Sequence, residues 1–220
     1  MVAETQSDYD KLLPTKILFF VALILLINVS IVLVLYTFLW QEPFHLVLSA
    51  EKRAFGDTLS SNLHSTMRFN GDKLYSLAFI QTGLENLAYN DLRQAQATDV
   101  AAEAITQLRF FGTMLDNLFD YALLLSYRAG FLAVAMTYAF FLILAVGIHG
   151  FVIRHRKRYG FGDTPLILNL WARSLLAYIL PITFFIWTLP FALNPYVLAT
   201  SLAVSVCGTG VFAFSLPKIA

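Results

Sequence analysis

Four ionisable side chains in the polar middle of the chain have types that suit acid–base or metal chemistry: His45, Glu51, Asp57 and His64. Their spacing matches no metal-binding motif. Helical spacing would also bring His64 near Ser60 or Ser61, but a serine and a histidine one turn apart are common by chance. We therefore predict neither a catalytic residue nor a metal site in this region.

Two further side chains, Cys207 and His149, are candidates for chemistry within the apolar runs. A single cysteine forms no internal disulfide, and its apolar surroundings favour a packing role. His149 stands between two glycines near the end of an apolar run, where a proton relay, haem ligation or simple hydrogen bonding are the alternatives. No other apolar run holds a histidine as a second haem ligand. We expect no cofactor.

The sequence contains none of the motifs HExxH, GxSxG or a phosphate-binding glycine loop. Its apolar runs carry no acid or base at their centres, whereas membrane enzymes and ion-coupled transporters normally keep ionisable groups there. We predict that the chain is not an enzyme, and the sequence identifies no small-molecule substrate.

Composition indicates a membrane protein. Hydrophobic residues make up 58% of the 220 residues, and charged residues 13%, about half the proportion of soluble domains. Such a chain cannot cover itself with polar surface in water, so lipid must solvate part of it. The net charge of +1 gives no overall excess that would attract nucleic acid, and we expect no direct nucleic-acid contact.

Four apolar runs are long enough to cross a hydrocarbon core of about 30 Å. We predict transmembrane helices at residues 17–40, 131–153, 174–193 and 196–216. The first run is longer than the apolar core of a cleaved signal peptide, and it ends in aromatic residues, including Tyr36, that suit the membrane boundary. The predicted fold is an all-α integral membrane protein with four spans.

A polar insert, residues 41–128, separates the first two spans and carries seven basic and ten acidic residues. We expect helices at about 44–67 and 73–89, with a turn at Phe69–Asp72 between them and a linker at Asn90–Thr98. A third helix follows, and since no proline separates it from the second span, one long helix is expected, with Gly130 as its weak point.

Two helical faces are predicted to bind other helices. The third insert helix carries a seam of coiled-coil type that would pack on the two preceding helices or on another subunit. The fourth span carries small residues four apart, which let helix backbones approach closely in lipid. The seam comprises Ala101, Ala104, Leu108, Phe111, Leu115, Leu118, Ala122 and Leu125. The small-residue face comprises Ala199, Ala203 and Cys207 in one row, and Ser201, Ser205 and Gly208 beside it.

Orientation follows from the basic segment after the second span, residues 154–173. It contains Arg154, Arg156, Lys157 and Arg158, which suit either a nucleic-acid patch or, because they directly follow an apolar span, contact with lipid head groups on the cytoplasmic side. We take the second reading. It places residues 1–16 and both termini in the cytoplasm, and the insert on the periplasmic side.

The stretch Ala145–Gly162 runs from an apolar span through a small residue into the basic segment, and then into an aromatic and glycine turn. This pattern, followed by a proline-containing span and a last apolar span, resembles a family of inner-membrane proteins of integrative conjugative elements and conjugative plasmids. The similar region covers about Phe140–Pro195. The resemblance implies a bacterial inner-membrane protein linked to DNA transfer by a machine of the type IV secretion kind. It implies no catalytic residue.

Three functions are compatible with these features. The missing catalytic groups, the seam and the small-residue face favour a structural or interaction subunit of a conjugative assembly. A membrane sensor with a periplasmic helical domain and an oligomeric channel or transporter subunit are the alternatives. The expected partners are membrane lipid and other inner-membrane proteins or further copies of the chain.

Overall fold

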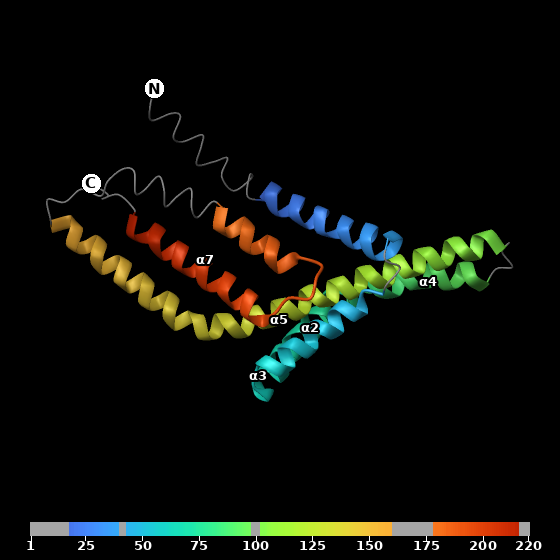
Figure 1. Ribbon diagram of the computed structural model, residues 1–220, viewed down its shortest axis with the longest axis horizontal. Helices are drawn as coiled ribbons and strands as arrows, with labels where there is room; N and C mark the ends of the chain where they lie inside the picture. Colours follow the sequence, from blue (N-terminus) through green and yellow to red (C-terminus); the bar gives the residue numbers. More distant parts are fainter. Residues whose placement is uncertain (1–17, 40–42, 98–101, 160–177, 216–220) are drawn as a thin grey trace, which may run out of the picture. The chain divides into compact units, whose positions relative to one another are not determined.

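The computed structural model describes residues 18–39, 43–97, 102–159 and 178–215, and every regular element in these ranges is helical (Figure 1). The predicted all-helical class is confirmed for this part of the chain. The elements are the helix Leu18–Thr37 with its π-helical end η1 (Val32–Leu39), α2 (His45–Thr58), α3 (Ser61–Tyr75), η2 (Ser76–Ile80), α4 (Leu84–Ala97), α5 (Ala102–Tyr159), the helix Tyr178–Thr188 and α7 (Pro195–Ser215).

Within the described ranges, two helices are long and apolar enough to cross a membrane, namely Leu18–Thr37 and the part Arg109–Val152 of α5. Tyr178–Thr188 and Pro195–Gly208 are shorter apolar helices. The predicted span at 174–193 differs from the structure at its end, because the helix stops at Thr188. Pro190 follows two residues later and disfavours helical backbone before it. The four-span topology stays a prediction.

The chain divides into two compact units. One contains Met1–Ile24, Ala135–Trp187 and Tyr196–Ala220, and the other contains Leu25–Val134 and Thr188–Pro195. The short loop between the last two apolar helices therefore belongs to the same unit as the insert. This grouping has a specific cause, which is the set of polar contacts described below.

Helix α5 is continuous over 58 residues, so it joins the third predicted insert helix to the second predicted span and extends into the basic segment as far as Tyr159. The predicted continuity is confirmed. Gly130, however, is no weak point. A Cβ atom there would overlap the carbonyl oxygen of Met67, and one at Gly71 would lie 2.9 Å from the Cα of Tyr127. The two glycines let α3 and α5 cross with their backbones in contact.

The predicted turn at Phe69–Asp72 is wrong, since these residues lie inside α3. The glycine that suggested a turn is buried against α5 instead. The chain reverses earlier, at the extended pair Leu59 and Ser60. Helical structure is interrupted again at Gly83, whose φ of +74° suits a residue without a side chain. The predicted linker also differs, because α4 continues to Ala97.

The core of the larger unit joins the first helix, the start of α2 and the middle of α5. Its aromatic rings meet edge to face: the Tyr36 and Phe44 centroids are 4.8 Å apart, and those of Phe44 and Tyr121 are 5.8 Å apart. The buried residues of this core are Val32, Tyr36, Phe44, Leu48, Tyr121 and Leu124. Asn117, also buried, accepts a hydrogen bond from the Phe44 backbone N–H at 3.0 Å and thereby fixes the start of α2.

Candidate functional site

Two opposite charges lie on the buried faces of their helices. Glu51 shares a face of α2 with Leu48 and Phe55, three residues before it and four after it, and is 0% exposed. Arg128 lies one turn beyond Leu124 on α5 and is 1% exposed. An isolated charge in such a place would be strongly unfavourable, so each needs the other.

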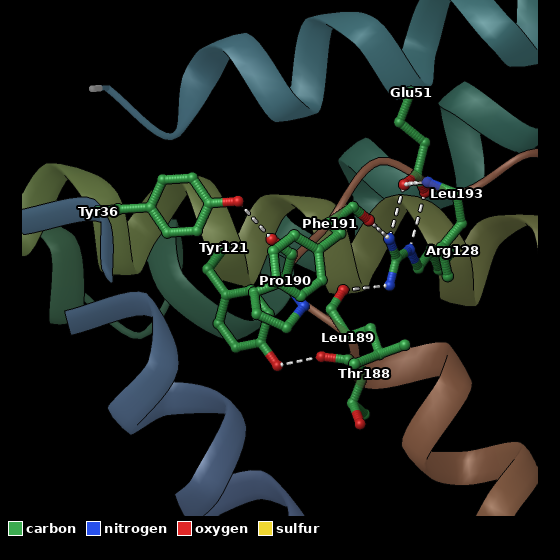
Figure 2. A network of polar contacts seen from close by, with 9 residues as sticks. All are labelled: Tyr36, Glu51, Tyr121, Arg128, Thr188, Leu189, Pro190, Phe191 and Leu193. Carbon is green, nitrogen blue, oxygen red and sulfur yellow. Dashed lines mark hydrogen bonds and ion pairs between the residues drawn. The ribbon is translucent and has the colours of Figure 1, made fainter. Parts of the chain in front are cut away.

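The guanidinium of Arg128 and the carboxylate of Glu51 form a two-point ion pair (Figure 2). Arg128 Nε donates to Glu51 Oε1 at 2.7 Å, and Nη2 donates to Oε2 at 2.6 Å. The planar fork of an arginine matches both carboxylate oxygens at once, which a lysine cannot do. The geometry therefore specifies arginine at this position.

The same two side chains hold the loop between the last two apolar helices. Arg128 Nη1 donates to the carbonyl of Leu189 at 2.7 Å, and Nη2 donates to the carbonyl of Phe191 at 2.6 Å. Glu51 Oε2 accepts the backbone N–H of Leu193 at 2.9 Å. The ion pair thus bridges α2, α5 and a loop that lies more than sixty residues further along the chain.

Two tyrosines complete the loop's hydrogen bonding. The Tyr121 hydroxyl donates to the Thr188 carbonyl at 2.6 Å, and the Tyr36 hydroxyl donates to the Pro190 carbonyl at 2.8 Å. Figure 2 shows both phenols pointing at the loop. With the two carbonyls that Arg128 binds, four successive carbonyls at residues 188–191 each receive a side-chain donor. Carbonyls at a helix end need such partners where water does not reach them.

A further polar contact joins this loop to the first helix. The Asn28 side chain, 0% exposed, donates from Nδ2 to the hydroxyl of Thr188 at 2.9 Å. We call the set Asn28, Tyr36, Glu51, Tyr121 and Arg128 the loop clamp. Chemically, the clamp neutralises a buried charge and fixes a backbone segment.

The residues first considered for acid–base chemistry do not gather at this clamp, Glu51 excepted. His45 and Asp57 are exposed on α2. The ring of His64 shares a 2.8 Å hydrogen bond with the Tyr127 hydroxyl, and Lys52 lies 5.8 Å from the centre of the same tyrosine ring. Among the described residues, no group of three or more His, Cys, Asp or Glu could hold a metal ion.

Comparison with known families decides the relationship of the chain. The family described as "IncC plasmid conjugative DNA transfer protein DtrJ-like" matches residues 48–215, more than half of the sequence. The chain belongs to the DtrJ-like family. The predicted resemblance to a conjugation-associated family is thereby confirmed, and over a longer stretch than Phe140–Pro195. The matched region includes Glu51, Arg128 and the clamped loop. No curated protein and no solved structure matches the chain.

In this DtrJ-like chain the predicted coiled-coil seam lies beside the buried face of α5. Ala101 is outside the described residues, as are the side chains of Ala104 and Leu108. Phe111 is 51% exposed, and the rest of the seam, Leu115, Leu118, Ala122 and Leu125, is half-buried. Asn117, Tyr121, Leu124 and Arg128 are buried and repeat the spacing of four and three residues one position earlier, and Tyr127 and Phe131 are buried beside them. The inward face is therefore rotated by about one residue, or about 100°.

The predicted small-residue face of α7 separates into two rows. Ser201 accepts a 2.9 Å hydrogen bond from Trp187 Nε1, and the hydroxyls of Ser205 and Thr183 lie 2.6 Å apart. This row, together with buried Gly208, faces the helix Tyr178–Thr188, which runs beside α7 in Figure 1. The other row, Ala199, Ala203 and Cys207, is exposed.

The basic residues Arg154, Arg156, Lys157 and Arg158 fall within α5, but their side chains lie outside the described residues. The remainder of the predicted turn, residues 160–173, also lies outside them. His149 is exposed on α5. The structure therefore leaves the head-group role of the basic residues as a prediction.

Sequence reasoning missed the roles of the clamp residues. The sequence pattern places Tyr36 at the membrane boundary and Arg128 at the end of the insert, and it indicates no contact of either with the loop. The sequence does carry a signal for the ion pair, because Glu51 and Arg128 each interrupt an otherwise apolar helix face. Opposite charges on two buried faces predict that the two side chains pair with each other.

Proposed function

We propose that the chain is a non-enzymatic structural subunit of an inner-membrane conjugative DNA-transfer assembly of the type IV secretion kind. Membership of the DtrJ-like family supports the role in conjugation. The observation that carries the structural role is the loop clamp. Arg128 makes four hydrogen bonds to Glu51 and to the loop, so this buried charge holds the chain's own backbone in place.

A catalytic arginine and carboxylate would instead be placed so that they could contact a reacting molecule. Here both are almost completely buried, and the contacts of Glu51 are to Arg128 and to the Leu193 N–H. Such an arrangement suits a structural subunit that must keep its own fold while it binds neighbouring subunits. It therefore supports a scaffold rather than an enzyme.

The proposal includes four membrane spans with both termini in the cytoplasm. The helix Leu18–Thr37 and the apolar part of α5 support two of them. Helix α7 has 21 residues and is about 30 Å long at 1.5 Å per residue, which is enough for a third. The helix Tyr178–Thr188 would complete the fourth only together with preceding residues that lie outside the described ranges.

The test combines transfer and co-purification. Donor cells lacking the gene should transfer the conjugative element at a much lower frequency, and the wild-type gene should restore it. A tagged chain extracted in mild detergent should co-purify with other membrane components of the transfer machine. Normal transfer without the gene, or a chain that purifies alone, would count against the proposed function. A tag beside Arg158 that is accessible only from outside the cell would overturn the orientation.

A further inference from the structure

Helix α3 is attached to α5 at two points. At the first, Gly71 and Gly130 let the two backbones touch. The second is polar: Nε2 of His64 lies 2.8 Å from the hydroxyl oxygen of Tyr127, and the two rings meet edge to face with centroids 6.4 Å apart. The His64 ring also lies against α2, because a methyl group added at Gly56 would be 3.7 Å from its Cε1. This histidine therefore stands where three helices meet.

The Tyr127 hydroxyl determines how the proton of this hydrogen bond is shared when His64 is neutral. Tyr127 is 1% exposed, and within the described residues its hydroxyl hydrogen-bonds to His64 alone. A buried O–H group needs an acceptor, and a neutral imidazole has one nitrogen that can accept. We therefore assign the tautomer in which Nε2 accepts from the Tyr127 hydroxyl and Nδ1 carries the ring proton.

A proton added to His64 reverses this hydrogen bond. Both nitrogens of an imidazolium are donors, so Nε2–H then donates to the Tyr127 oxygen and the phenol's own hydrogen loses its acceptor. A buried donor without a partner opposes the packing of α3 on α5. Histidine is the side chain whose charge ordinarily changes between about pH 5 and 8, so mild acid is enough to cause this reversal.

The charges around the contact act in the same direction. The groups that face it from α2, α3 and α5 are the buried pair Glu51 and Arg128, the exposed pair Arg68 and Asp72, and Lys52. The Lys52 ammonium group lies 5.8 Å from the centre of the Tyr127 ring and also interacts with half-buried Asp120. A proton on His64 places a second positive charge beside the same ring, whereas Glu51 and Asp72 are already paired. Two cations repel each other most strongly where water is partly excluded.

We propose that His64 and Tyr127 form a pH-sensitive latch, which holds α3 on α5 while His64 is neutral and releases it when His64 is protonated. The chain on either side of α3 leaves the α-helical path, with Leu59 and Ser60 extended before it and the π-helical η2 after it, so α3 can move between them. The latch does not depend on the role in DNA transfer. Its exposure to the pH outside the cytoplasm rests on the proposed orientation of the insert.

Hydrogen exchange of the full chain in mild detergent, read by mass spectrometry, tests the latch. After correction for the intrinsic pH dependence of exchange, the α3 amides should lose protection at least about fivefold between about pH 7.5 and about pH 5.5. Helix α4 is the internal control, because it contains no histidine and is held to α5 by Tyr89, which stacks on Phe119 at 5.6 Å and donates to Asp116. Its protection should stay unchanged over the same range.

Three variants separate the latch from a general effect of acid. His64→Gln keeps an oxygen that can accept from the Tyr127 hydroxyl but does not titrate, so α3 should be equally protected at both pH values. Tyr127→Phe removes the O–H group that protonation strands, so α3 should be less protected at neutral pH and should respond much less to acid. His45→Gln is the matched control, because His45 is exposed on α2, and it should keep the wild-type response.

The latch is contradicted if α3 of the wild type is equally protected at both pH values. An acid response of wild-type size in His64→Gln or in Tyr127→Phe would also overturn it. Because the wild type and Tyr127→Phe are measured as well, the test does not depend on the folding of His64→Gln. The orientation is tested separately by the tag beside Arg158, so failure of the latch and failure of the proposed topology can be told apart.

Discussion

The side chains of Arg128 and Glu51, 77 positions apart in sequence, meet at 2.6 Å with at most 1% of either exposed to solvent. Their pairing makes the loop Thr188–Pro195 part of the same compact unit as the insert. A buried pair of this kind contributes little net stability against an apolar replacement, but the loss of one partner leaves the other as an uncompensated charge. This asymmetry leads to the first prediction.

Arg128→Ala and Glu51→Ala should each lower the free energy of unfolding by about 3–5 kcal/mol, because each strands one buried charge. Arg128→Lys should restore only part of this, since an ammonium group cannot pair with both oxygens and both loop carbonyls. The double substitution Glu51→Met/Arg128→Met should be less damaging than the sum of the two alanine variants. Denaturant titration of the protein in detergent measures all four.

The matched control is the exposed ion pair of Arg68 and Asp72 on α3, whose atoms are 3.6 Å apart and whose side chains are 65% and 53% exposed. Such surface pairs contribute about 0–1 kcal/mol, so Arg68→Ala should change little. Equal effects of Arg68→Ala and Arg128→Ala would show that the buried clamp is not a special feature of this fold.

Tyr121→Phe removes the donor to the Thr188 carbonyl while keeping the ring that packs on Phe44. The expected cost is about 1–3 kcal/mol, the usual penalty for deleting one partner of a buried hydrogen bond. Limited proteolysis should also cut the loop at residues 188–195 faster than in the wild type. Tyr138, 66% exposed on α5, supplies the control: Tyr138→Phe should alter neither the stability nor the cleavage rate.

Helix content was readable from the sequence, but the inward face of α5 was not. The seam Leu118, Ala122 and Leu125 has the correct period, yet the buried positions are one residue earlier. Two of those positions, Asn117 and Arg128, are polar, so the pattern of apolar residues alone does not indicate the inward face. Buried polar residues are acceptable only with partners, and the partners come from α2 and the loop, which local pattern cannot locate.

The predicted helix boundaries in the insert are wrong for a related reason. Gly71 within a polar stretch predicts a turn when only its neighbours in sequence are considered. In the fold it provides space for the backbone of Tyr127, so the glycine serves a helix crossing. The loop clamp could not be predicted from local sequence for the same reason, because all of its contacts to residues 188–193 join distant parts of the chain. The charges of Glu51 and Arg128 on otherwise apolar helix faces predict that a buried ion pair exists. They do not predict that the pair lies against the loop at residues 188–193.

Gly130→Ala should destabilise the protein, because the added methyl group would meet the backbone of α3 at Met67 and Gly71. Overpacking against backbone costs about 1–3 kcal/mol. A methyl group added at Gly112 on the same helix would have nothing within 4 Å, so Gly112→Ala should instead stabilise by about 0.5–1 kcal/mol. Thermal unfolding of both variants tests the crossing, and the same sign for both would contradict it.

Alkaline pH should weaken the contact between α4 and α5. Burial raises the pKa of Tyr89 well above 10, and its hydrogen bond to Asp116 raises it further; burial, with Glu85, likewise raises the pKa of Tyr75 to about 12. Each phenol therefore holds its proton in the folded chain at a pH where the unfolded chain has lost it. Their contribution to stability is fully present below about pH 10 and declines as the pH rises from there through the folded pKa.

Ultraviolet titration of the phenolates measures this directly. Tyr89→Phe should remove one late-titrating group from the ten tyrosines and make the loss of stability above pH 10 less steep. Asp116→Asn should lower the pKa of Tyr89 only part of the way toward 10, because burial, the larger cause, remains. If Asp116→Asn returned Tyr89 to ordinary titration, the hydrogen bond rather than burial against Phe119 would dominate, and the packing of α4 on α5 would have to be looser than the structure indicates.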